Sequence, residues 1–124
     1  MKAPTHYDSL EADLIADALW KLALSQGMIQ YGQLAPIVKM EPSNPLFWQL
    51  LGEISADTQE RFGVMLSAIV VNKRDGFPGG EFFDLAIDLN RGVNDQLEFW
   101  AREVQAVHAK AMELKNVNGV VVWR

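Results

Sequence analysis

Apolar residues recur at three- and four-residue steps near the start of the chain, and this spacing predicts an amphipathic helix. Its apolar face consists of Leu10, Leu14, Ile15, Ala18, Leu19 and Leu22. Asp8 and Glu11 have the spacing of a capping box, which marks the beginning of the helix. Gly27 is the expected left-handed residue at its end.

The following stretch predicts two short helices joined by a polar turn. The first covers residues 32–38, after an extended connection at 28–31. The second begins after Ser43-Asn44-Pro45, where a capping residue precedes a proline, and has apolar residues at helical spacing as far as Ile54. Capping spacing from Asp57 to Glu60, followed by Gly63, predicts a separate single turn. The pair is a candidate helix-turn-helix.

The apolar period changes at residues 67–72, where Ile69, Val70 and Val71 are β-branched and predict a buried strand. Asp75-Gly76 is a hairpin-type dipeptide. A second β-branched run, 120–123, follows an Asn-Gly turn. We expect this terminal run to pair with residues 69–72 in a small antiparallel sheet, because pairing satisfies both backbones.

Two more helices are predicted in the second half, one over residues 81–89 and a longer one from Asn94 or Asp95 to about Lys115. The stripe of the long helix comprises Leu97, Trp100, Ala101, Val104, Val107, His108, Ala111 and Leu114. The expected fold is therefore α+β and mostly helical. It is a single winged-helix-like domain over residues 1–124, with a small antiparallel sheet and a long C-terminal helix.

Composition narrows the class of protein. The 124 residues are 49% apolar and 22% charged, as in ordinary soluble domains. No apolar run approaches the roughly 20 residues that cross a bilayer, and no signal peptide is evident, so a cytoplasmic protein without membrane contact is expected. The absence of cysteine excludes disulfides and thiolate chemistry. A net charge of −5 argues mildly against strong non-specific nucleic-acid binding, which depends on Lys and Arg.

The segment Tyr31-Gly-Gln-Leu-Ala35 resembles the Tyr-Gly-x-Leu-Ala helix in the DNA-binding domain of methylguanine-DNA methyltransferases and alkyltransferase-like proteins. The resemblance covers about residues 28–80. It implies a winged helix in which residues 50–54 lie in the recognition helix and residues 73–76 near the wing. The family's Pro-Cys-His-Arg site is absent, which excludes alkyl transfer. Residues 66–83 are also similar to a segment of uncharacterised bacterial and phage proteins, and that similarity implies no activity.

The first hypothesis is a non-catalytic binding module that contacts nucleic acid or a nucleoprotein complex. Its contacts would come from base-edge donors on the third helix and from phosphate-binding cations around it. The expected contact residues are Lys39, Trp48, Gln49, Lys73 and Arg74. Glu41 and Glu53 flank the same helix and weigh against this hypothesis, and no arginine lies on it to contact guanine.

The second hypothesis is an acidic protein-interaction or inhibitor module of phage origin, or a homodimer, acting through exposed aromatic residues and acidic helix faces. Adjacent aromatic pairs at 47–48, 82–83 and 99–100 cannot both face the core, so some are expected at an interface, although each could instead cover a boundary groove. Glu81, Asp84 and Asp88 share a helix face, where stabilisation by the helix dipole explains them better than a metal site. No catalytic constellation and no cofactor is predicted.

Overall fold

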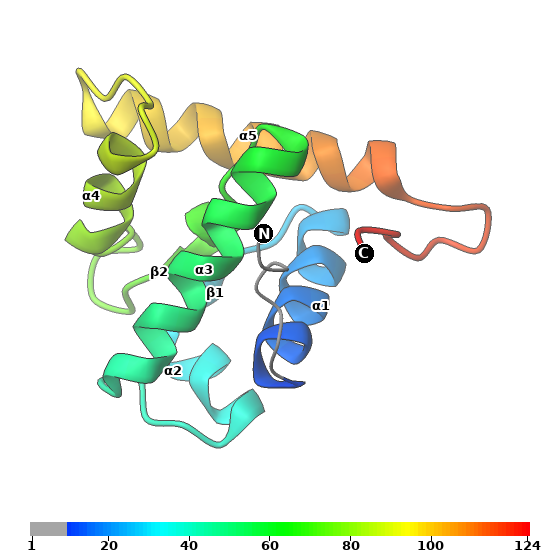
Figure 1. Ribbon diagram of the computed structural model, residues 1–124, viewed down its shortest axis with the longest axis horizontal. Helices are drawn as coiled ribbons and strands as arrows, with labels where there is room; N and C mark the ends of the chain where they lie inside the picture. The colour runs from blue at the N-terminus through cyan, green and yellow to red at the C-terminus, as the bar shows by residue number, and fades with distance from the viewer. Residues whose placement is uncertain (1–9) are drawn as a thin grey trace, which may run out of the picture.

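The computed structural model describes residues 10–124, and the fold is α+β and mostly helical. The elements are α1 (Leu10–Leu24), β1 (Ile29–Gln30), α2 (Tyr31–Leu34), the 3-10 helix η1 (Ala35–Val38), α3 (Pro45–Phe62), the 3-10 helix η2 (Leu66–Ile69), β2 (Val70–Val71), α4 (Gly80–Asp88) and α5 (Gln96–Leu114). In Figure 1, α5 runs along the top, α1 and α4 lie at opposite sides, and α3 crosses between them. Asp8 lies outside the described residues, as does the capping box predicted from it.

The centre of the fold is the segment Val64–Val71, in which every residue is buried. Helices α1, α3 and α5 all pack against η2, so this short segment is enclosed by the three longest helices. Residues 67–69 were predicted as strand but form 3-10 helix, and the strand is confined to Val70–Val71. A buried apolar run of this length fits either structure, because neither requires alternation when all sides are covered.

Side chains from α3 and α5 satisfy the backbone of this central segment. The N–H of Met65 donates to Glu103 Oε2 (2.7 Å), that of Leu66 to Thr58 Oγ1 (3.1 Å) and that of Ser67 to Ser55 Oγ (2.8 Å). The indole of Trp100 donates to the Ala68 carbonyl at 2.8 Å. A buried backbone N–H without an acceptor costs free energy. These polar side chains are therefore in the core because they form hydrogen bonds with the buried backbone of the central segment.

The predicted antiparallel sheet is wrong. Strand β2 pairs with β1 in parallel, with Ile29 opposite Val70 and Gln30 opposite Val71. The terminal run forms one antiparallel bridge, from Val121 to Lys115, and does not reach β2. The Asp75-Gly76 turn is present, with Gly76 at φ 66°, but no second strand follows it in residues 10–124.

Several helix ends agree with the sequence, and others do not. The Asn44 side chain caps α3, Asp95 caps α5, and Gly63 ends α3 at φ 76°. At the end of α1 the left-handed residue is Gln26, at φ 61°, and not Gly27. Helix α3 continues through residues 57–60 without a break, because the Asp57 carboxylate bonds to Arg61 at 2.8 Å and does not cap a new turn.

The aromatic side chains fill the core and its boundaries. None of those in residues 10–124 is exposed, although Trp48, Phe99 and Trp100 are only partly buried. Phe82 and Phe83 are both buried, so the expectation that two adjacent aromatic side chains cannot both face the core is wrong for this pair. On α5, Leu97 is exposed although the stripe placed it inside, and Glu103 is buried instead. None of the helices in residues 10–124 is long and apolar enough to cross a membrane.

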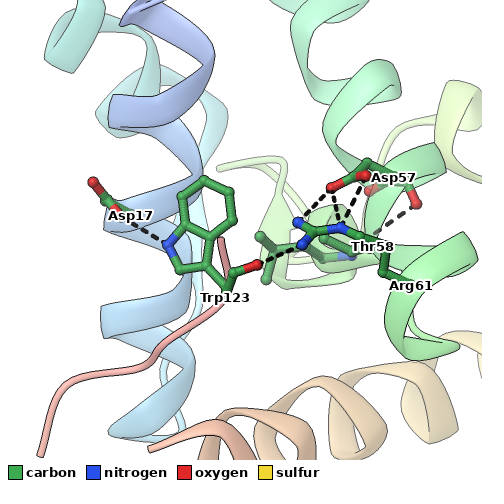
Figure 2. A network of polar contacts seen from close by, with 7 residues as sticks. Asp17, Asp57, Thr58, Arg61 and Trp123 are labelled. Atoms are coloured by element: carbon green, nitrogen blue, oxygen red, sulfur yellow. Dashed lines mark hydrogen bonds and ion pairs between the residues drawn. The ribbon is translucent and has the colours of Figure 1, made fainter. Parts of the chain in front are cut away.

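The C-terminus is held against α1 and α3. Figure 2 shows the Trp123 side chain pointing towards α1, where its indole donates to Asp17 Oδ1 at 2.8 Å. The Trp123 carbonyl accepts from Arg61 Nη1 at 2.7 Å, and the same guanidinium binds Asp57. Arg124 pairs with Asp17 at 2.9 Å. The last two residues thus join helices that are distant in sequence.

Candidate functional site

A small pocket lies between α3 and α4 and has about 90 Å³ of space. Four parts of the chain line it: α2, α3, the central segment and α4. The lining residues are Tyr31, Trp48, Leu51, Gly52, Ser67, Glu81, Phe82 and Leu85. The walls are thus aromatic and aliphatic, with two hydroxyls and one carboxylate among them, a composition typical of binding sites.

Tyr31 and Trp48 form the aromatic side of the pocket. Their ring centroids are 4.6 Å apart, and the rings are inclined by 41°. Tyr31 Oη accepts a hydrogen bond from the Gly79 N–H at 2.9 Å, which joins α2 to the loop before α4. Burial raises the pKa of the Tyr31 hydroxyl above its ordinary value of 10.0; the Gly79 hydrogen bond opposes this rise, and the charges of Glu81 and Asp75 add to it. At neutral pH the hydroxyl therefore keeps its proton.

Three of these side chains converge on Gly79. A Cβ atom at this position would lie 3.0 Å from Glu81 Oε1, 3.5 Å from Trp48 Cη2 and 3.6 Å from Tyr31 Oη. The backbone of Gly79 is in the extended region, at φ −68° and ψ 163°, so its conformation does not require glycine. A side chain at this position would therefore lie close to three of the residues that line the pocket.

Ser67 belongs to the pocket and to the core. The Ser55 hydroxyl donates to Ser67 Oγ at 2.7 Å, and both serines are buried. This contact fixes the side chain of Ser67 against α3. A hydroxyl has two lone pairs and one proton, so Ser67 still has one acceptor site and one donor site after this bond.

The surroundings of the pocket are acidic. Residues 40–60 and 75–90, which include α3 up to Glu60 and all of α4, contain no Lys or Arg. Five exposed carboxylates are lining residues, lie within a helical turn of one, or act electrostatically on Tyr31; they are Glu53, Asp75, Glu81, Asp84 and Asp88, and we call them the acidic rim. The local potential therefore favours a cationic ligand.

The residues predicted to contact nucleic acid come from three separate parts of the chain. Trp48 faces the pocket, and the Gln49 amide donates to Glu53 Oε2 at 3.1 Å. Lys39 is an exposed residue at the end of η1, with φ 61°, whereas Lys73 and Arg74 are exposed in the loop after β2. In Figure 1 the turn after η1 lies at the bottom and the loop before α4 at the left.

The loop of Lys73 and Arg74 is well ordered by its own hydrogen bonds. The backbone N–H and the side-chain amide of Asn72 both donate to the Phe77 carbonyl, at 2.9 and 3.1 Å. Asp75 Oδ1 accepts from the Phe77 N–H at 3.1 Å. Within residues 10–124, neither Lys73 nor Arg74 forms an ion pair.

The acidic residues of α4 do not assemble a metal site. Residues 10–124 contain no group of three or more His, Asp or Glu side chains placed to hold a metal ion. His108 Nε2 lies 3.1 Å from the Gly27 carbonyl and connects α5 to the end of α1. The functional interest of Glu81 is thus its place in the pocket.

Sequence patterns singled out some residues of this pocket but did not predict that they lie together. Tyr31 stood in the Tyr-Gly-x-Leu-Ala segment and Glu81 in the acidic face of α4, while Ser67 and Gly79 carried no signal of their own.

Comparisons with protein-family models, curated proteins and solved structures gave no match, so the resemblance to alkyltransferase-like domains stays a prediction.

Proposed function

We propose that the protein is a non-catalytic interaction module that binds a basic segment of a partner protein across the α3–α4 face. The observation that supports this function is the pocket between the two helices, with aromatic walls and the acidic rim beside it. Aromatic side chains and electrostatic complementarity are typical of specific protein interfaces.

The charge distribution favours a basic partner. The acidic rim provides five carboxylates, and the nearby cations without an ion pair within residues 10–124 are Lys73 and Arg74. The other arginines next to α3 and α4, Arg61 and Arg91, are bound to Asp57 and Glu103. A complementary partner is drawn to such a face by electrostatic steering, so its association slows as salt is added.

The experiment is a titration with a short peptide of alternating lysine and alanine, followed by calorimetry or heteronuclear NMR. A glutamate-alanine peptide of equal length is the control ligand. The protein variants are Asp84→Lys, in the rim, and Glu11→Lys, which makes the same charge change on α1, on the other side of the molecule in Figure 1. We expect Asp84→Lys to weaken binding about threefold more than Glu11→Lys does, since exposed charges contribute roughly 0.2–1 kcal/mol each. Failure of the lysine peptide to bind, or equal loss in both variants, would refute the proposal.

A second candidate function is nucleic-acid binding of winged-helix type, favoured by the ordered loop that presents Lys73 and Arg74. Both side chains are exposed, and α2 and α3 keep the order of a helix-turn-helix. Phosphate contacts by such cations make affinity fall as salt rises. The test is fluorescence anisotropy with duplex and single-stranded DNA: this function predicts salt-sensitive binding that Lys73→Glu with Arg74→Glu weakens. No binding at low salt would exclude it.

A further inference from the structure

The pocket has three features that together restrict what it can bind: its size, its aromatic wall and its acceptors. Its space of about 90 Å³ is well below the roughly 300–1,000 Å³ of sites that enclose a whole small molecule. It therefore suits the end of one side chain, with the rest of the ligand outside. The acidic rim outside adds charge for a ligand that carries further cations.

We propose that this pocket takes the protonated amine of a lysine side chain, which a partner protein inserts between α3 and α4. The inference rests on the proposed function and names the group that is recognised. The aromatic rings of Tyr31 and Trp48 lie against the space that the amine would enter. A cation within about 6 Å of such ring faces is attracted by their negative electrostatic potential.

The oxygens around the pocket match an ammonium group. An ammonium has three donors and no acceptor. Glu81 supplies a full negative charge, and the hydroxyls of Tyr31 and Ser67 each keep an unused lone pair after the bonds from Gly79 and Ser55. These three acceptors come from three separate parts of the chain: α4, α2 and the central segment. The arrangement suits a compact cation with rotatable donors better than the planar fork of arginine, which favours two oxygens of one carboxylate.

The remaining walls suit the aliphatic part of a lysine. Leu51, Phe82 and Leu85 line the pocket, and a lysine stem of four methylene groups packs on such apolar surface while its charged end meets polar groups. The beginning of α4 carries a fractional positive charge, roughly half a unit, and the full charge of Glu81 in its first turn outweighs it.

Gly79 offers a substitution that tests the pocket directly. In Gly79→Ala the new methyl group would lie 3.0 Å from Glu81 Oε1 and 3.5 and 3.6 Å from Trp48 and Tyr31, so it would crowd three lining residues that would contact the amine, while the backbone keeps an allowed conformation. Gly80→Ala is the matched control, because a Cβ atom there meets nothing within 4 Å. A second variant, Glu81→Gln, keeps the shape and removes the charge, so the test does not depend on the methyl group alone.

The probes are Nα-acetyl-lysine amide and the lysine-alanine peptide, each compared with its Nε-acetylated form. We expect the unmodified probes to shift the NMR signals of the Gly79 amide and the Trp48 indole. We expect binding about tenfold weaker in Gly79→Ala and in Glu81→Gln, corresponding to one cation–π contact with one charged partner. Gly80→Ala should bind as the parent protein does, and the acetylated probes should bind at least tenfold more weakly, since acetylation removes the charge.

The outcomes separate this inference from the proposed function. If the lysine peptide binds but Gly79→Ala and Glu81→Gln leave its affinity unchanged, the pocket is not the lysine site and the acidic face alone acts. Equal affinity for acetylated lysine, or tighter binding of an arginine-alanine peptide, would also overturn the ammonium assignment. Tight binding of a single-stranded oligonucleotide that Gly79→Ala abolishes would assign the pocket to a nucleobase instead. Failure of every basic peptide would overturn both proposals.

Discussion

The carboxylate of Glu103 and the backbone N–H of Met65 are 2.7 Å apart, and this hydrogen bond lies inside the core. The same carboxylate binds Arg91 through both oxygens, at 2.6 and 3.0 Å. Arg91 in turn donates to Gln59 Oε1 at 2.7 Å and lies over the ring of Phe99. One buried acid thus connects α5, the loop before it, α3 and the central segment.

Removing either member of the Glu103–Arg91 pair should be strongly destabilising. Glu103→Ala leaves the Met65 N–H and the Arg91 guanidinium without their acceptor, and we expect a loss of about 3 kcal/mol in the free energy of unfolding. Denaturant unfolding measures this loss. The matched control is Glu98→Ala, which breaks an exposed pair with Arg102 and should cost less than about 1 kcal/mol. Similar losses in the two variants would contradict the structural role of Glu103.

Trp123 should be the anchor of the C-terminal segment. The residue is 3% exposed and joins Asp17 and Arg61 through its indole and its carbonyl. Trp123→Ala removes a buried aromatic group and should cost about 3 kcal/mol of unfolding free energy, measured by thermal or denaturant unfolding. Val122→Ala, at a position 54% exposed, should change stability by less than about 0.5 kcal/mol. Equal effects would mean that the terminus does not pack as described.

The hydroxyl of Tyr31 should make stability fall at alkaline pH. Its pKa is raised above 10.0 in the folded protein, chiefly by burial, so the folded state holds this proton more tightly than the unfolded chain does. The resulting stabilisation is complete below pH 10 and is lost as pH rises from there through the folded pKa. Unfolding of the parent protein and of Tyr31→Phe across this range should show a decline that the variant lacks. Tyrosinate absorbance should show one tyrosine ionising late, and its loss in Tyr31→Phe assigns it.

Two glycines of α3 provide a matched pair for backbone effects. Neither Gly52 nor Gly63 has an atom within 4 Å of a Cβ position, but Gly63 is left-handed at φ 76° and Gly52 is within the helix. Gly52→Ala should stabilise the protein by about 1 kcal/mol through helix propensity. Gly63→Ala should destabilise it by a comparable amount, about 1 kcal/mol, because alanine is strained there. Thermal unfolding of both variants tests the opposite signs.

Local signals predicted most of the helices, because the residues that begin or end a helix lie within a few positions of its ends. The cap at Asn44 with Pro45 behind it, and the left-handed Gly63, mark both ends of α3. The acidic spacing at residues 57–60 was misleading, since Asp57 is used by Arg61 one turn later and by no new helix start. A carboxylate can serve either purpose, and the spacing alone does not distinguish them.

Long-range pairing was the part that sequence did not reveal. The β-branched runs at 69–71 and 120–122 suggested mutual pairing, yet Val70–Val71 pairs with the weakly patterned Ile29–Gln30. The terminal run is instead drawn to α1 and α3 by the hydrogen bonds of Trp123. The pocket was missed for the same reason, because Tyr31, Ser67 and Glu81 come from separate elements.

The central segment also determines when the protein can complete its fold. Its backbone donors take their acceptors from α3, which precedes it, and from Glu103 of α5, which is 38 residues further along the chain. A chain that ends before α5 would lack both the Glu103 acceptor of the Met65 N–H and the helix that packs on η2, so we expect its N-terminal half to be much less stable than the whole fold. Closing such a long loop is slow compared with helix formation. We therefore expect the helices to form early and the centre of the molecule to be the last part to become native.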